Sequence, residues 1–196
     1  MKGISEKIKD GKKYIYIGHA NKKMSRVFYF LAVPILIALA VWIFFSLSQS
    51  NWRVLQILLI YAGAFLIYGT LGVWLHEQLH CLGFRGTANE ANTSITYERK
   101  FGVLLTGYYS VEGEIEYPIL RRALLMPLCL AAGFILIGCI GALFLPGWWL
   151  PILLTLAVVS IFDMIHDIYM VSEMRKIGTK GIYKDCGHYL EVILRE

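Results

Sequence analysis

The chain has 196 residues, of which 57% are hydrophobic and only 17% are charged, and its formal net charge is +5 at pH 7. Soluble globular domains are a little under half apolar and about a quarter charged, so this composition excludes an ordinary soluble domain and indicates an integral membrane protein. The positive charge is not carried by an arginine-rich stretch interleaved with aromatic residues, so we expect no nucleic-acid partner.

The first 26 residues carry many lysines, and we predict a cytoplasmic N-terminal segment in which KKYIYIG forms a strand. Four long apolar stretches follow. Each is close to the roughly 20 residues that a helix needs to cross the hydrocarbon core of a membrane. We therefore predict a membrane domain over 27–175, with transmembrane helices at about 27–47, 54–82, 123–145 and 148–170, followed by a cytoplasmic tail over 176–196.

The loop between the second and third stretches contains TSITYER and FGVLLTGYYSVEGEIEY. In both segments β-branched and aromatic residues are interrupted by polar residues or glycine, which is typical of short strands and hairpin turns. The predicted fold class is therefore an all-α membrane protein with four transmembrane helices and a small cytoplasmic β-containing loop between helices 2 and 3.

The basic residues predict the orientation in the membrane. If the N-terminus is cytoplasmic, every lysine and arginine except Arg53 falls on the cytoplasmic side. So uneven a distribution follows the positive-inside rule. We expect a multi-pass protein of the cell membrane with both termini in the cytoplasm, and its basic face next to anionic lipid.

The segment LGVWLHEQLHCLGF, at the end of the second stretch, contains the pattern HExxH. On a helix, residues four apart share one face, so His76 and His80 present two imidazoles to one point, and Glu77 can reach a water bound there. Ionisable groups in a membrane helix cost a few kcal/mol each, which favours a functional role. The alternative is that both histidines end the helix at the interface and bond to loop carbonyls.

A hydrolytic zinc site needs three protein ligands and one open position for water. SIFDMIHDIYM, in the fourth stretch, offers Asp163, His166 and Asp167 on the same side of the membrane. Counted at 1.5 Å per residue from Trp52 and Trp148 as outer anchors, Asp167 comes nearer to the depth of the histidines than Asp163. Asp167 is therefore the favoured third ligand. Asp163 would then orient a ligand histidine, and His166 would bond a carboxylate.

Several of these features together resemble a known family. HExxH on an early transmembrane helix, an aspartate on a later helix, and RRALLMPLCLAAG leading into the third stretch resemble bacterial membrane proteins described as zincin peptidases, which are distantly similar to site-2 proteases. The resemblance runs from about residue 71 to KDCGHYLEVI. It implies a membrane zinc peptidase, and it points to the aspartate of HDIYM, Asp167, as a ligand.

The predicted function is zinc-dependent hydrolysis of membrane-associated proteins or peptides near the cytoplasmic face, with Zn²⁺ held by His76, His80 and Asp167. Glu77 would be the general base, and the strands of the middle loop would hold an extended substrate by edge pairing. Two other functions stay open: a catalytically silent protein that binds or regulates a membrane partner, and a small transporter with Asp163, His166 and His76 on an ion path. The oligomeric state is open too.

Overall fold

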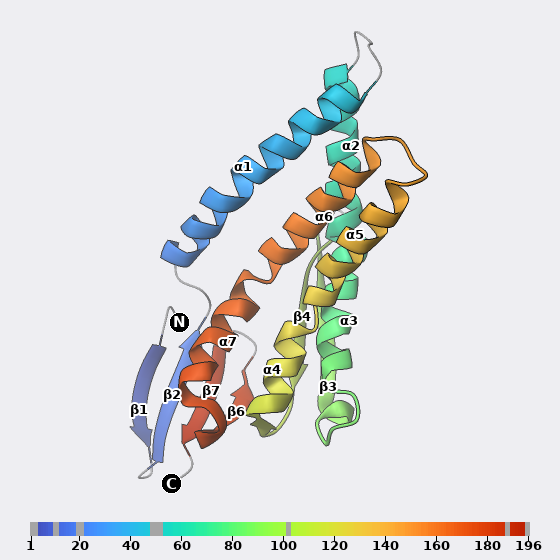
Figure 1. The fold of residues 1–196 in the computed structure, drawn as a ribbon. Helices are drawn as coiled ribbons and strands as arrows, with labels where there is room; N and C mark the ends of the chain where they lie inside the picture. The colour runs from blue at the N-terminus through green and yellow to red at the C-terminus, as the bar shows by residue number, and fades with distance from the viewer. Residues whose placement is uncertain are drawn as a thin grey trace.

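A computed structural model describes residues 4–9, 12–18, 22–47, 53–100, 103–186 and 189–194, and Figure 1 shows an elongated molecule. Long helices fill most of its length, and a sheet lies at the end where both termini are found. Trp52, used above as an outer anchor, lies outside the described residues. The helices are α1 (Lys22–Ser46), α2 (Arg53–Ile67), the π-helical turn η1 (Tyr68–Gly72), α3 (Val73–Gly83), α4 (Tyr117–Leu125), α5 (Leu128–Gly141), α6 (Trp149–Asp163) and α7 (Ile165–Ile177).

Two helical rods are long and apolar enough to cross a membrane, namely Val54–Gly83 and Tyr117–Gly141. The chain bends by 47° between α6 and α7. If the two helices nevertheless count as one span, they make a third. In α1, the stretch Phe30–Ser46, over which all side chains are described, is apolar but shorter than a span. The structure therefore supports two or three spans among its described residues, and the four predicted spans are not confirmed.

The strands correct the predicted all-α class. Five of them form one antiparallel sheet in the order β1-β2-β7-β6-β5, and β3 and β4 form a separate hairpin. KKYIYIG is a strand as predicted, and it pairs with β1 and β7. The strands are β1 (Ile4–Lys9), β2 (Lys12–Gly18), β3 (Thr93–Lys100), β4 (Val103–Val111), β5 (Ile115–Glu116), β6 (Gly181–Asp185) and β7 (Tyr189–Leu194).

Alternating side chains explain why residues 176–196, predicted as a tail, fold against the helices. In β7, Leu190 and Val192 are buried while their neighbours are partly exposed, which is the period of a strand with one covered face. They share a hydrophobic core with Ile17 of β2, Phe84 after α3, and Met174 of α7. The two predicted terminal segments therefore form one body with the helix ends.

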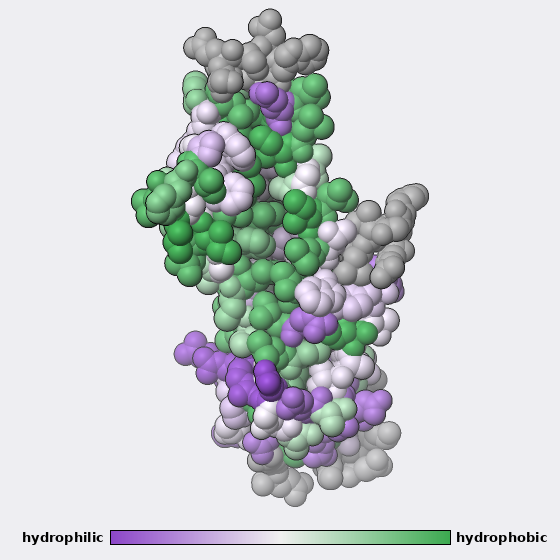
Figure 2. All heavy atoms as spheres, turned by 90° about the vertical axis from the view of Figure 1, so that its right-hand side faces the viewer, coloured by the Kyte–Doolittle hydropathy of each residue, from purple (hydrophilic) through white to green (hydrophobic). Residues whose placement is uncertain are grey.

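Hydropathy divides the molecule along its length. Figure 2 shows hydrophobic side chains over most of the helical part, and hydrophilic side chains gathered at the end that carries the sheet. Phe30, Leu58 and Leu136 are among the large apolar side chains that are exposed on the helices. A contiguous exposed apolar surface of this kind is what a lipid environment covers, so the surface agrees with a membrane protein.

A tight contact joins α3 to α4. A Cβ atom on Gly83 would overlap the backbone of Ala123, so only glycine allows this approach. Arg122 fixes the same contact, since its Nε donates to the Gly83 carbonyl at 2.7 Å and its Nη2 to the Arg85 carbonyl at 3.1 Å. The Gly83 carbonyl is one of the last four of α3, which have no partner within the helix, and the Arg85 carbonyl lies just beyond its end.

Replacing Gly83 by alanine should push α3 away from α4 and destabilise the protein by about 1 to 3 kcal/mol, the usual cost of overpacking a tight contact. Thermal unfolding in detergent measures the change. Gly63→Ala is the matched control, because a Cβ at Gly63 meets nothing within 4 Å. Equal melting temperatures for the two variants would contradict the role assigned to Gly83.

Candidate metal centre

The HEQLH sequence lies on α3, with its two histidines and its glutamate turned into the protein and Gln78 exposed. His76, Glu77 and His80 are exposed by only 4%, 7% and 1%. Buried polar side chains of this kind are costly unless each finds a partner. The partners come from three other elements, which are α4, β4 and the α6–α7 segment.

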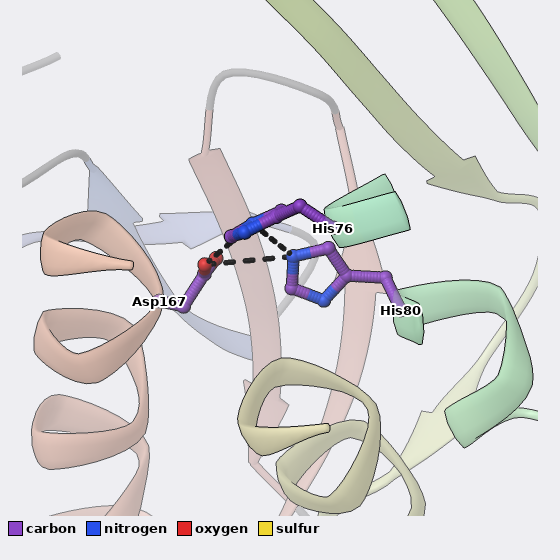
Figure 3. A group of neighbouring side chains, drawn as sticks. All are labelled: His76, His80 and Asp167. Carbon is purple, nitrogen blue, oxygen red and sulfur yellow. Dashed lines mark hydrogen bonds and ion pairs between the residues drawn. The ribbon is translucent and has the colours of Figure 1, made fainter. Parts of the chain in front are cut away.

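His76, His80 and Asp167 converge on one point (Figure 3). The two histidine Nε2 atoms are 3.0 Å apart, and each lies 3.5 Å from Asp167 Oδ2. Two ligands of a tetrahedral zinc ion, each about 2.1 Å from the metal, are about 3.4 Å apart. The three atoms are therefore spaced as the protein ligands of one such ion would be.

A hydrogen bond from the other ring nitrogen fixes the His80 imidazole. Its Nδ1 lies 2.9 Å from the carbonyl oxygen of Ala123. A carbonyl only accepts, so Nδ1 carries the proton and a neutral ring leaves a lone pair on Nε2. That lone pair is directed at the point shared with Asp167, which is the arrangement a ligand histidine needs.

His76 is oriented by a side chain instead. Its Nδ1 lies 3.4 Å from Asp163 Oδ2 at ion-pair distance, with no hydrogen bond to this nitrogen among the described residues. The Tyr68 hydroxyl donates to the same Asp163 oxygen at 3.1 Å. Asp163 thus lies behind His76, in the place where a second carboxylate can hold a ligand imidazole.

The bend between α6 and α7 separates the two aspartates. Asp163 ends α6 and Asp167 lies in the first turn of α7, with Met164 between the helices. Asp163 therefore meets Nδ1 of His76, while Asp167 meets Nε2. His166, which the sequence offered as an alternative ligand, is exposed and is not part of the converging group. The two remaining histidines of the chain, His19 and His188, lie outside the described residues.

Glu77 faces the β3–β4 hairpin. Its Oε2 accepts a hydrogen bond of 2.9 Å from the backbone N–H of Tyr109 in β4. A Cβ atom on Gly107 would overlap Cγ of Glu77, so the missing side chain at 107 makes room for the glutamate. The backbone of β4 thus fixes the Glu77 carboxylate beside the two histidines.

Tyr109 also covers the centre. Its ring stacks on the His80 ring with 4.4 Å between centroids. Burial raises the pKa of the Tyr109 phenol well above its usual value, and nearby carboxylates add to the shift, so the ring stays neutral at physiological pH. Gln78 binds the hairpin at a second point, because its Nε2 donates to the Tyr97 hydroxyl at 3.3 Å.

Removing either aspartate should weaken metal binding, but by different amounts. We expect purified protein in detergent to bind about one Zn²⁺ per chain, and Asp167→Ala to lose most of it because one ligand is gone. Asp163→Ala should reduce affinity by about 10- to 100-fold, as for a residue that only orients a ligand. Competition with a chromogenic chelator measures both. The reverse order would make Asp163 the ligand.

Comparison of the chain with protein-family models, with curated proteins and with solved structures finds no match. The function of the protein must therefore be inferred from the chemistry of the residues that meet at this centre.

Proposed function

We propose that the protein is a membrane-embedded zinc metallopeptidase that cleaves membrane-associated proteins or peptides near the cytoplasmic face. The observation that carries this proposal is the convergence of His76, His80 and Asp167 at ligand spacing, with the Glu77 carboxylate fixed alongside. Three ligands leave one position of a tetrahedral ion for water, as in hydrolytic sites.

The residues divide the chemistry between them. When bound, zinc lowers the pKa of a coordinated water toward 7 and polarises the carbonyl of the substrate. Glu77 accepts the proton of the attacking water at a carboxylate oxygen and then delivers it to the leaving amine. The Tyr109 N–H donates to Oε2, so we assign Oε1, to which no hydrogen bond is seen among the described residues, as the oxygen that receives the proton.

The outer edge of β4 supports an extended peptide as substrate. The Tyr109 N–H is directed at Glu77 and so away from β3, and in an antiparallel pair alternate residues direct their backbone groups to the same side. Gly107 and Tyr109 therefore present the same edge. Because Glu77 already accepts the Tyr109 N–H, a substrate strand would pair with this edge through Gly107, which would place a peptide bond next to Glu77.

The sheet supports the proposed orientation. Strands from the two ends of the chain, β2 and β7, are paired, so both ends lie on the same side of any membrane that the helices cross. The excess of lysine and arginine at these ends favours the cytoplasm. We therefore assign the protein to the cell membrane as a multi-pass protein, with the metal centre toward the cytoplasmic side.

The decisive variant is Glu77→Gln, which removes the base but none of the three ligands. It should bind Zn²⁺ like the wild type and lose cleavage at least 100-fold, because an amide cannot accept the proton. New protein N-termini in membranes of expressing cells, mapped by mass spectrometry, report cleavage. Glu114→Gln makes the same change at an exposed glutamate and should cleave normally. N-termini that persist in Glu77→Gln would indicate a catalytically silent protein.

Gly107→Ala should displace the Glu77 carboxylate and leave the three proposed zinc ligands in place. The new Cβ overlaps Cγ of Glu77, and a displacement of about 1 Å at a catalytic group costs about 100-fold in rate. The abundance of new N-termini, mapped as for Glu77→Gln, measures the rate of cleavage. Competition with a chelator should show that the zinc affinity is unchanged. Gly133→Ala, where a Cβ meets nothing within 4 Å, is the control. Wild-type cleavage by Gly107→Ala would show that the hairpin does not position Glu77.

A further inference from the structure

We infer that Pro127 is a positioning residue for the metal centre, because it leaves the Ala123 carbonyl free to hold His80. The inference rests on the proposed function for its purpose, since an oriented histidine matters most where it binds a metal. Its structural basis, however, is a set of hydrogen bonds that exist without a bound metal.

In an α-helix the carbonyl of residue i accepts the N–H of residue i+4. For Ala123 that residue is Pro127, which has no N–H to donate. The helix is interrupted here, with α4 ending at Leu125 and α5 beginning at Leu128. Among the backbone groups of the described residues, the Ala123 oxygen accepts only a long bond of 3.3 Å from Met126 N, which donates at 3.0 Å to the Arg122 carbonyl as well.

The carbonyl that Pro127 releases is the one that binds His80. Ala123 is fully buried and His80 is 1% exposed, so no water competes for either group. An unpaired polar group in such a place costs a few kcal/mol. The His80 Nδ1–H, at 2.9 Å, satisfies the Ala123 oxygen, and the oxygen in turn fixes which nitrogen of the ring is protonated.

Gly83 supplies the second half of this arrangement. It lies on α3 three residues after His80, and its missing Cβ lets the Ala123 backbone approach. Gly83 thus brings the carbonyl within reach of the ring, and Pro127 keeps that carbonyl available. The two proposed ligand histidines therefore have different neighbours at Nδ1, the Asp163 carboxylate at ion-pair distance for His76 and a hydrogen-bonded backbone carbonyl for His80. No side-chain replacement at Ala123 removes the latter acceptor.

The test is Pro127→Ala, which restores the missing N–H and allows a regular helical turn. Zinc affinity should fall about 10- to 100-fold, the usual effect of losing a group that orients a ligand. In metal-free protein labelled with ¹⁵N-histidine, the NMR shifts of His80 should change from the Nδ1–H form to a mixture of tautomers. Pro34→Ala removes the proline inside α1 and should alter neither measurement.

A second pair of chains separates the missing donor from any effect on folding. Pro127→Leu adds an N–H, whereas the α-hydroxy analogue of leucine at 127 has the same side chain and an ester oxygen in place of the N–H. The ester chain should recover zinc affinity and the Nδ1–H tautomer relative to Pro127→Leu. Equal results for the two chains would overturn the inference.

The outcomes also distinguish this inference from the proposed function. A wild-type protein that binds no Zn²⁺ would refute the proposed metal centre, and the tautomer of His80, which needs no metal, would still decide the role of Pro127. If the wild type binds Zn²⁺ and Pro127→Ala matches it in affinity and tautomer, the role of Pro127 is refuted and the metal centre stands.

Discussion

The contact between Gly83 and Ala123 is the constraint on which the rest of the structure depends. It lets two helices that are distant in sequence approach at backbone distance, where small residues commonly form helix interfaces in membranes. Through it α4 presents a carbonyl to His80, and Phe84 enters the core that joins the helices to the sheet. The candidate metal centre and the hydrophobic core thus share one contact.

The polar side chains of the candidate metal centre can be buried in an apolar molecule because they have polar partners. Each carboxylate and imidazole there is close to a partner from another element, so that α7, β4 and α4 all contact α3 through polar atoms. If one partner were lost, the other polar group would stay buried without a hydrogen bond, and its desolvation would cost free energy with nothing to offset it. The residues proposed for catalysis therefore also fix how these elements pack around α3.

The sequence predicted the helical rod of α2 and α3, the strand KKYIYIG, and the residues that converge, because periodicity and motif spacing are local signals. It did not predict β6 and β7, although GIYKD and YLEVIL alternate as strands do. The Tyr109 N–H and the Ala123 carbonyl could not be predicted. They are backbone groups, present at nearly every residue, and only the tertiary fold decides which of them meets a side chain.

The pairing of β2 with β7 places a condition on biosynthesis. Ile17 faces Leu190 across the sheet, so nearly the whole chain must be made before these strands can meet. Closing so long a loop is slow, and contacts of high sequence separation form late in folding. In the proposed membrane topology, the helices can enter the bilayer one after another during translation, whereas β2 and β7 can pair only afterwards. The helices of a nascent chain would thus lie in the bilayer before the hydrophobic core that they share with these strands is complete. The core contains Tyr169 and Met170, which follow Asp167 closely in α7.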